Sequence, residues 1–225
     1  MNIKLKPIKV YIVGGATNYA SWFSFAHEIL PCTDEALVKA DLVFFTGGED
    51  VTPSLYGDKK LPQTFCNYTR DMVEIEIFKT ALALKIPMIG VCRGSQFLTV
   101  MQEEGKLVQH VTQHANGNHL IKFLDQETTY FITSTHHQMM YPFKVAKAEI
   151  LAVANTPLSA KYELGDYTTA YLPGNIEPEI VYYPVTNCLC IQGHPEMMEK
   201  DMPIISVLNN LVLEKLKLIP YEEIP

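Results

Sequence analysis

One cysteine of this chain stands in a sequence context that favours nucleophilic chemistry. The segment Pro87-Met-Ile-Gly-Val-Cys-Arg-Gly-Ser-Gln places Cys92 between an apolar run and a predicted helix, with Gly90 two residues before it and Gly94 two after. This is the layout of a nucleophile elbow, which lifts a side chain out of a sheet towards solvent. The helix N-terminus also favours a thiolate. The alternative, a small buried cysteine that closes a strand, is disfavoured by the matched glycines.

A nucleophilic thiol needs a base, and His194 has the sequence context of one. It follows an apolar run in a Gly-His-Pro-Glu turn, and Pro195 biases its backbone away from helix. Glu196 is the nearest carboxylate that can fix the tautomer of the ring. A His-Pro-Glu tripeptide alone fits an ordinary surface turn. Because ligands bind at the carboxyl ends of strands in an open α/β sheet, the two signals together predict a triad of Cys92, His194 and Glu196.

The strands that position these residues are predicted from short apolar runs. These runs cover residues 10–13, 42–45, 87–91, 150–153, 179–183 and 188–191. A helix is predicted over residues 70–85, with a buried face of Met72, Ile75, Phe78 and Leu82 at helical spacing. Strand, helix and strand in succession predict a parallel sheet.

Two further helices are predicted, over residues 19–30 and 201–218. The first ends before Pro31. The second has an apolar stripe, typical of core packing, of Ile204, Ile205, Leu208, Leu211, Val212 and Leu216. Residues 105–175 are richer in His, Gln, Thr and Gly and predict smaller strands and loops. We therefore expect one domain over residues 1–225: an α/β fold with an open, mostly parallel sheet, helices on both faces and small additional strands.

Composition limits the kind of partner. The 225 residues are 48% hydrophobic and 19% charged, as in folded globular proteins, and the net charge of -7 comes without a basic cluster. We therefore expect a small-molecule ligand and no nucleic acid. No apolar run approaches the roughly 18 residues of a membrane span, and no signal cleavage site follows the N-terminal strand, so we expect no membrane association and a cytoplasmic location. The five cysteines have no zinc-type spacing.

Several motifs together resemble a known family. Residues 90–96 (Gly-Val-Cys-Arg-Gly-Ser-Gln) and 193–196 (Gly-His-Pro-Glu) are similar to the two signatures of class I glutamine amidotransferases. Residues 47–57, 70–74 and 134–138 narrow the resemblance to the γ-glutamyl hydrolase (peptidase C26) branch, and within it to γ-glutamyl-γ-aminobutyrate hydrolases. The matches run from about residue 10 to residue 200. The fold that the resemblance implies is the flavodoxin-like fold of class I glutamine amidotransferases.

The resemblance also implies roles for individual residues. Main-chain N–H groups of Gly47, Gly48 and Arg93 would form the oxyanion hole. The glutamyl part of the substrate would be held by Gln96 and by main-chain groups of Ser134 and Thr135. His136 and His137 would bind substrate at the pocket rim, where one would contact the leaving amine. The implied reaction cleaves the C–N bond of a γ-glutamyl amide through a glutamyl thioester, does not cut peptide bonds of proteins, and needs no metal or organic cofactor.

Three departures from the family pattern border the expected pocket. Thr46 stands where the hydrolase branch usually has proline, and Gly193 where many relatives have an aromatic residue. The glycine-rich stretch after the nucleophile helix is replaced by Met-Gln-Glu-Glu-Gly-Lys at residues 101–106. These changes affect which substrate the pocket accepts more than they affect the reaction of the cysteine.

Other polar clusters are weighed against ordinary structural roles. His110 and His114 are four residues apart, but their neighbours favour strand or loop over a helix that would present both to a metal. Glu49 and Asp50 follow the double glycine and would attract an amine, although we expect them on a solvated loop face. For His136 and His137, a pocket rim and an ordinary loop both remain open.

Three functions remain open from the sequence. The first is a stand-alone hydrolase of γ-glutamyl amides that releases the amine. The second is a glutaminase that delivers ammonia to a separate synthetase, since the chain has no Gly-x-x-x-x-Gly-Lys-[Ser/Thr] nucleotide loop of its own. The third is a catalytically silent binding module on the same fold. The partners expected are a small γ-glutamyl substrate and, in addition, a synthetase or a second copy of the chain.

Overall fold

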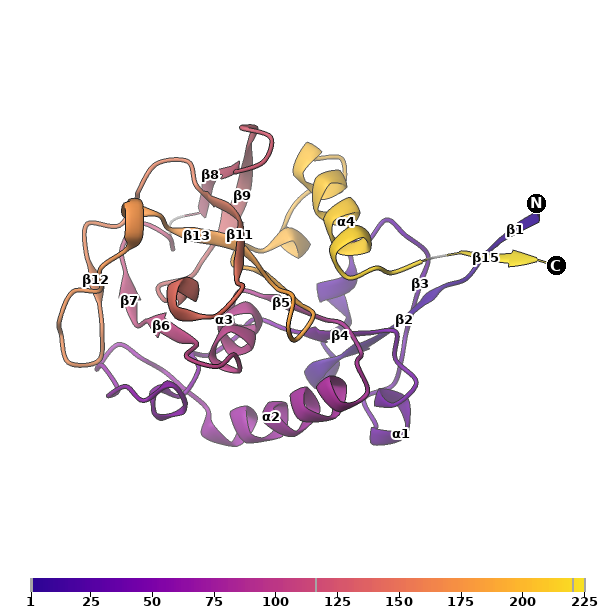
Figure 1. Cartoon of the computed structure of the whole chain (residues 1–225), viewed down its shortest axis with the longest axis horizontal. Coiled ribbons are helices and arrows are strands. Elements are labelled where there is room, and N and C mark those ends of the chain that lie inside the picture. Colours follow the sequence, from indigo (N-terminus) through magenta and orange to yellow (C-terminus); the bar gives the residue numbers. More distant parts are fainter. Residues whose placement is uncertain (1, 116, 220, 225) are drawn as a thin grey trace.

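The computed structural model describes residues 2–115, 117–219 and 221–224. Within these ranges the main sheet has nine strands (Figure 1). In spatial order they are β3 (His27–Ile29), β2 (Ile8–Ile12), β4 (Leu42–Phe45), β5 (Met88–Val91), β14 (Cys188–Ile191), β13 (Pro178–Tyr183), β11 (Glu149–Ala154), β8 (Gly117–Phe123) and β9 (Thr129–Ser134).

The sheet changes character at β14. The strands from β3 to β14 pair in parallel, whereas those from β14 to β9 pair antiparallel. The six predicted strands are all present, and their ends differ from the predicted ones by two residues at most. β4, β5 and β14 are buried along their whole length, as continuous apolar runs predict. The predicted α/β fold is confirmed.

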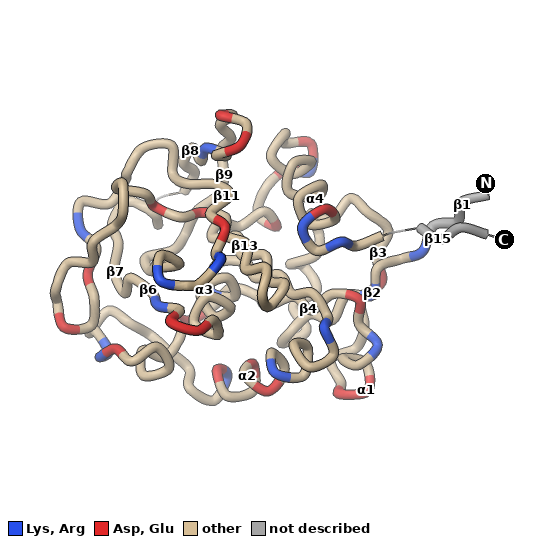
Figure 2. Tube along the Cα trace, viewed as in Figure 1, with Lys and Arg blue, Asp and Glu red and all other residues tan. Residues whose placement is uncertain are grey.

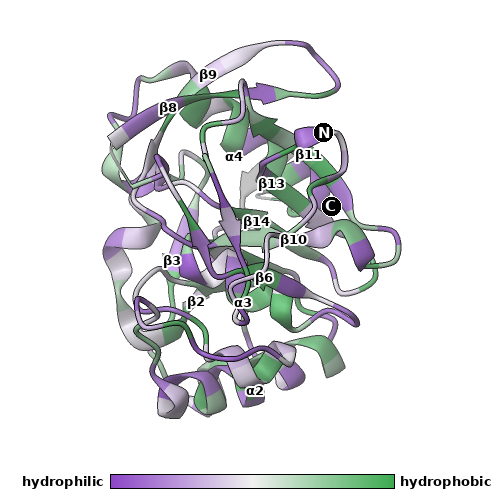
Figure 3. Cartoon of the chain, turned by 90° about the vertical axis from the view of Figure 1, so that its left-hand side faces the viewer, coloured by the Kyte–Doolittle hydropathy of each residue, from purple (hydrophilic) through white to green (hydrophobic). Residues whose placement is uncertain are grey.

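Helices cover both faces of this sheet (Figure 1). They are α1 (Asp34–Leu37), α2 (Tyr68–Ala83), α3 (Arg93–Val100) and α4 (Pro203–Lys215). The first three pack into one apolar cluster and α4 into another, on opposite sides of the strands. The stripe predicted for the C-terminal helix is confirmed, with Leu211 only partly buried. Figure 3 shows hydrophobic residues along the central strands and hydrophilic residues in the surrounding loops.

Smaller elements complete the chain. The short strands form two-stranded pairs: β6 (Lys106–Val108) with β10 (Met139–Tyr141), β7 (His110–Val111) with β12 (Tyr162–Glu163), and β1 (Asn2–Leu5) with β15 (Tyr221–Ile224). The 3-10 helices are η1 (Val13–Gly15), η2 (Thr17–Ala20), η3 (Pro53–Tyr56), η4 (Pro142–Lys144), η5 (Pro173–Asn175) and η6 (Pro195–Met197). The small strands expected between residues 105 and 175 are therefore present.

The helix predicted over residues 19–30 is wrong. This segment contains the end of η2, an irregular turn and β3, which pairs in parallel with β2. Its polar backbone groups find partners outside a helix: Ser24 N–H donates to Asn209 Oδ1 at 2.7 Å, and the Trp22 carbonyl accepts from Asn209 Nδ2 at 3.0 Å. Phe23 stacks on Phe25 with ring centroids 4.6 Å apart. Core packing of the aromatic side chains therefore takes place in an irregular turn rather than in a helix.

The helix predicted over residues 70–85 is present as α2, and Phe78 and Ile75 of its predicted apolar face pack against the core, but the other two residues of that face do not. Met72 and Leu82 are 39% and 40% exposed. The buried side chains of α2 are Asp71, Glu74, Phe78 and Ala81. Two carboxylates point inward because a buried arginine, described below, compensates them.

Within the described ranges, no helix is long and apolar enough to cross a membrane. All five cysteines have free thiols. Lys and Arg positions are scattered among Asp and Glu positions along the trace (Figure 2).

Candidate active site

Cys92 lies in a sharp turn between β5 and α3. Its backbone has φ 52° and ψ −112°, a conformation that a non-glycine residue holds only when its surroundings impose it. The Cys92 N–H donates to the Ile191 carbonyl at 2.9 Å. A Cβ at Gly94 would collide with the Phe45 carbonyl, and one at Gly90 would lie 2.5 Å from the Gly94 backbone. Both glycines of the predicted elbow are thus required by close packing.

The thiol faces a pocket rather than bulk solvent, because Cys92 is only 8% exposed. The pocket has a volume of about 130 Å³. Its lining contains Gly48, Glu49, Asp50, Phe65, Cys92, Gln96, Thr135, His136, His137 and Gln138. Segments far apart in the sequence therefore meet around the sulfur.

His194 lies in the loop that follows β14, the neighbour of β5. Its Nδ1 lies 2.7 Å from Glu196 Oε1, and its backbone N–H donates to the Thr133 carbonyl at 2.8 Å. The backbone has φ −115° and ψ 80°, outside the helical region, as Pro195 predicts. Because β5 and β14 run in parallel, Cys92 and His194 leave the sheet at the same edge.

The pKa of His194 is consistent with a role as the proton-transfer partner of the Cys92 thiol. Burial lowers the pKa of this imidazole, but the interactions with Cys92 and Glu196 outweigh burial and raise the pKa to about 10. Its Nε2 atom is buried and has no hydrogen bond to the described residues. One ring nitrogen is thus fixed by Glu196, and the other is free for proton transfer.

The Gly47-Gly48 loop closes the site on another side. A Cβ at Gly47 would lie 2.6 Å from the Tyr19 hydroxyl and 3.3 Å from His194 Cε1. Gly48 has φ 139° and lies against the Arg70 guanidinium, which leaves no room for a side chain. A side chain at Gly47 would require Tyr19 to move, and one at Gly48 would in addition be strained by the positive φ, so the two glycines let this loop lie against His194 and Arg70.

A buried ion-pair network connects this loop to the nucleophile turn. The side chain of Arg93, 1% exposed, pairs with Asp71 and Glu74 of α2. Glu74 Oε1 also accepts from Arg70 Nε at 2.8 Å, and Arg70 Nη2 donates to the Gly47 carbonyl at 3.0 Å. The family motif contained Arg70, Asp71 and Glu74, but sequence reasoning did not find that they link Arg93 to the glycine loop.

The residues predicted to hold substrate separate into two groups. Gln96, Thr135, His136 and His137 line the pocket with Cys92. Gln96 Nε2 donates to the Gln138 carbonyl at 3.0 Å, which fixes its amide. Ser134 lies outside this lining: it is 1% exposed and its hydroxyl donates to the His114 carbonyl.

The solvated loop face expected for Asp50 is wrong. Its side chain is largely buried, because Oδ2 accepts from the Phe65 N–H at 2.8 Å and Oδ1 lies 3.1 Å from His137 Nε2. This contact with Asp50 raises the pKa of His137. Glu49 is half exposed and pairs with Arg70 at 2.8 Å. The pocket therefore has an acidic side.

The structure explains two of the positions, Thr46 and Gly193, at which the sequence departs from the family pattern. Thr46 Oγ1 accepts from Arg70 Nη2 at 3.2 Å, a bond that proline cannot make. A Cβ at Gly193 would lie 2.5 Å from Ile132, so no larger residue fits without rearrangement. Ile132 therefore occupies the space into which a larger residue at position 193 would extend.

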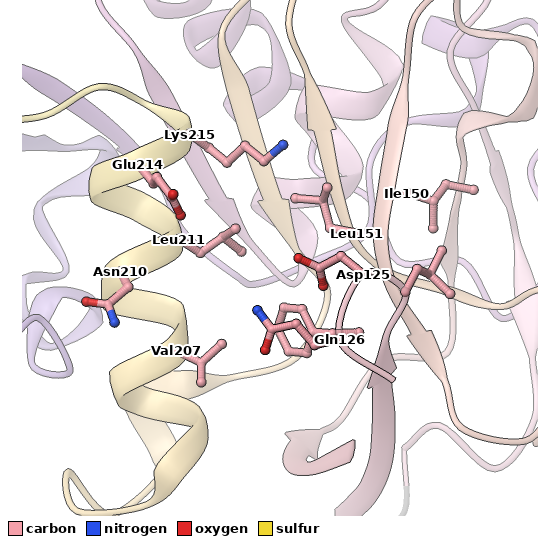
Figure 4. Close-up of a pocket in the computed structure, with 11 residues that line it drawn as sticks. Asp125, Gln126, Ile150, Leu151, Val207, Asn210, Leu211, Glu214 and Lys215 are labelled. Atoms are coloured by element: carbon pink, nitrogen blue, oxygen red, sulfur yellow. The ribbon is translucent and has the colours of Figure 1, made fainter. Parts of the chain in front are cut away.

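Two larger hollows lie elsewhere. A groove of about 1250 Å³ adjoins the glycine loop, with Tyr11, Tyr19, Gly47, Arg70 and Met72 among its lining residues. A hollow of about 570 Å³ lies between α4 and the strands β8 and β11 (Figure 4). Its lining residues include neither Cys92 nor His194, and they contain no cysteine, serine or histidine.

His110 and His114, considered as a pair in the sequence, are separated in the structure. His110 faces His137, with ring centroids 6.0 Å apart. His114 lies instead beside His119 and His136, with centroids 5.2 and 4.7 Å away. Sequence reasoning missed this cluster because its members come from separate loops and strands. The alternation Glu177-Pro-Glu179, which places both acids on one strand face, was the available signal.

Solved structures share this arrangement of sheet and helices. A putative GMP synthase component of Thermoplasma acidophilum aligns with a TM-score of 0.56 and 11% identity, over 95% of this chain and 96% of the other. A glutamine amidotransferase of Thermotoga maritima aligns with a TM-score of 0.53 and 14% identity, over 95% and 86%. The fold is thus that of the class I glutamine amidotransferases.

The family is defined more narrowly by sequence. The peptidase C26 family matches residues 29–156, and the chain belongs to this family. A putative glutamine amidotransferase-like protein of Lactococcus lactis subsp. lactis is 32% identical over 165 residues, 71% of this chain and 67% of that protein. A similarly described protein of Rickettsia prowazekii is 39% identical over 69 residues, 30% of this chain and 24% of its own length. The resemblance to glutamine amidotransferases and to peptidase C26 is confirmed.

Proposed function

We propose that this protein hydrolyses the amide bond of small γ-glutamyl compounds, with Cys92 as nucleophile, His194 as acid and base, and Glu196 as the group that orients His194. The observation that carries this proposal is the pairing of a strained, glycine-flanked cysteine with a buried histidine whose Nδ1 is held by a carboxylate at 2.7 Å. Membership of the peptidase C26 family supports a hydrolase of this type.

The reaction proceeds through a covalent intermediate. His194 takes the proton of the Cys92 thiol, and the sulfur attacks the γ-carbonyl carbon. The carbonyl oxygen becomes an oxyanion that accepts hydrogen bonds from the backbone N–H groups of Gly47, Gly48 and Arg93. The C–N bond then breaks, and protonated His194 gives its proton to the departing amine. In the second half, His194 takes a proton from water as the water attacks the thioester, which releases glutamate and the thiol.

The pocket supports a small acyl group. Its volume of about 130 Å³ and its lining by Gln96, Thr135, His136 and His137 suit a glutamyl moiety. Ser134 contributes through its main chain and the position of its neighbours, since its hydroxyl is engaged with His114. Glu49 and Asp50 lie where they attract the α-amino group of the substrate.

The larger groove next to Gly47 is the place that we assign to the leaving amine. Its aromatic and apolar lining residues suit an amine with a carbon chain better than ammonia alone. We therefore favour a stand-alone hydrolase of γ-glutamyl amines, such as γ-glutamyl-γ-aminobutyrate.

Product release tests this proposal directly. Purified protein is incubated with γ-glutamyl-γ-aminobutyrate, γ-glutamyl-putrescine and glutamine, and glutamate, amine and ammonia are measured. We expect turnover of the γ-glutamyl amines above glutamine, its loss in Cys92→Ala, and its retention in Cys66→Ser, a free cysteine outside the pocket lining. Equal rates in wild type and Cys92→Ala contradict the assignment of Cys92, and inactivity on every substrate favours a silent binding module.

A second candidate is a glutaminase that passes ammonia to a synthetase. It is favoured by the apolar residues exposed near the site, Phe65 at 72%, Tyr68 at 55% and Val73 at 57%, which would suit a partner surface. The structural neighbour described as a component of a GMP synthase points the same way. Activity on glutamine alone, with no turnover of γ-glutamyl amines, distinguishes this candidate from the first.

A further inference from the structure

A buried cluster of three histidines and two glutamates lies behind one wall of the Cys92 pocket. Its members are His114, His119, His136, Glu177 and Glu179. The side chains are between 0% and 9% exposed. They come from the loop after β7, from β8, from the loop after β9, from the residue before β13 and from β13 itself. The reaction proposed above uses none of them except the edge of His136 that lines the pocket.

In two of the histidines, the ring nitrogen that points away from the centre of the cluster contacts a hydrogen-bond acceptor. His114 Nε2 lies 3.1 Å from Glu177 Oε2. Glu177 is itself fixed, since it accepts from the N–H groups of Leu158 and Ser159 at 2.8 Å each. His136 Nδ1 lies 2.8 Å from the carbonyl oxygen of Gln138, which can only accept. These contacts place the ring protons on Nε2 of His114 and on Nδ1 of His136.

The opposite ring nitrogens therefore turn their lone pairs to the centre of the cluster, where they meet a carboxylate. Oε1 of Glu179 lies 3.3 Å from His114 Nδ1, 3.8 Å from His136 Nε2 and 3.0 Å from His119 Nε2. Neither His114 Nδ1 nor His136 Nε2 has a hydrogen-bond partner among the described residues, and Glu179 Oε2 is equally without one. Lone pairs and a carboxylate that face one another in a dry interior are stabilised by a positive charge between them, which either a metal ion or a proton can supply.

We propose that this cluster binds a divalent transition metal of the zinc type, with His114, His119, His136 and Glu179 as ligands. Three imidazole nitrogens and one carboxylate form a ligand set that zinc takes, whereas calcium and magnesium prefer oxygen ligands. Metal-bound histidines in proteins are oriented by a carboxylate or a carbonyl on the other ring nitrogen, which are the roles of Glu177 and the Gln138 carbonyl here.

The spacing of the ligand atoms fits this metal. At zinc–nitrogen distances of about 2.0–2.1 Å, the ligand atoms of a tetrahedron lie about 3.3 Å apart. The contacts of Glu179 with the three rings bracket this value, and the candidate atoms of His114, His119 and Glu179 all lie within 4.8 Å of one another. With four protein ligands the site is closed, so the metal is structural: it ties the segment of residues 134–138, which lines the Cys92 pocket, to β8 and β13.

The sequence predicted no metal in this protein, and the metal site does not depend on the proposed reaction. The test uses full-length protein carrying Cys92→Ala, so that the active-site thiol cannot bind the metal. After treatment with a chelator, the protein is titrated with Zn²⁺ and with Co²⁺. We expect one equivalent of each, visible Co²⁺ bands typical of tetrahedral coordination without sulfur-to-metal absorption in the near ultraviolet, and a rise in melting temperature with Zn²⁺.

Two variants complete the test. His119→Gln removes a ligand, and we expect it to weaken Zn²⁺ binding by more than about 100-fold, since changes in groups that only orient ligands already cost 10–100-fold. His27→Gln, a histidine remote from the cluster whose Nδ1 contacts the Phe25 carbonyl, should bind as tightly as the parent. If the parent protein takes up no Zn²⁺, or takes it up with sulfur-to-metal absorption, the proposal is overturned and a proton on His114 supplies the positive charge.

Discussion

At the scale of single residues, Cys92 is held by contacts that leave no alternative to glycine on either side. Gly94 lies so close to the Phe45 carbonyl that a methyl group has no space, whereas Gly57 has φ 74° but open space around its Cβ position. Gly94→Ala should therefore cost about 1–3 kcal/mol through overpacking and displace Cys92. Gly57→Ala should cost about 1–2 kcal/mol through backbone strain and leave activity intact. Urea denaturation and the activity assay measure both.

The charge of His194 sets the second prediction at this scale. In the proposed reaction, protonated His194 gives its proton to the leaving amine, and its pKa is raised to about 10. Activity should therefore hold below this pKa and fall as the pH rises through it. Glu196→Gln removes one of the interactions that raise the pKa, so the alkaline fall should move to lower pH.

The measurement is the pH dependence of kcat/KM for wild type and Glu196→Gln. An alkaline fall that stays in place in the variant, even with a lower maximal rate, would show that Glu196 does not act on the protonation of His194. Glu199→Gln, a change in a nearby exposed carboxylate, is the matched control and should leave the profile unchanged.

At the scale of elements, α2 is the helix that joins the nucleophile turn to the glycine loop. Glu74 is buried and pairs with both Arg93 and Arg70, so Glu74→Gln leaves Arg93 short of one partner charge. Because Asp71 still compensates Arg93, we expect a loss in the free energy of unfolding below the roughly 3–5 kcal/mol that breaking a buried ion pair costs. Glu76→Gln, on the exposed side of the same helix, should change stability by less than about 1 kcal/mol.

The errors in the sequence-based elements have a shared cause. Helical spacing in residues 70–85 predicted an apolar face. In the structure, Asp71 and Glu74 of this helix are also buried, because they form ion pairs with Arg93, which is distant in the sequence. Likewise, a helix was predicted over residues 19–30 from their place after the first strand and before Pro31, but the side chain of Asn209 satisfies the backbone of an irregular turn there. Periodicity describes one segment, whereas burial depends on what packs against it.

At the scale of the whole molecule, the N- and C-terminal parts share one apolar cluster. Trp22, the single tryptophan, is 2% exposed, and its carbonyl accepts from Asn209 of α4. If residues 1–225 form one domain, which stays a prediction, tryptophan fluorescence and far-ultraviolet circular dichroism should give the same urea midpoint. Two separate midpoints would show that the chain unfolds in more than one unit. The cytoplasmic location also stays a prediction.

The sequence by itself determined the features that short segments carry. Continuous apolar runs specified the buried strands, because burial on both faces of a sheet requires them. The glycines around Cys92 and the turn at His194 indicated where a nucleophile and a base belong, since each depends on immediate neighbours. These signals also sufficed for the fold class and the family.

Only the tertiary structure decided which distant charges meet. The burial of Asp71, Glu74 and Asp50 follows from Arg93 and His137, whose positions the sequence does not reveal. The group around His114 and Glu179 comes together only when the strands β8 and β13 are placed in one sheet. The physical reason is that a buried charge is stable only beside its partner, and the partner is chosen by the packing of the fold rather than by proximity along the chain.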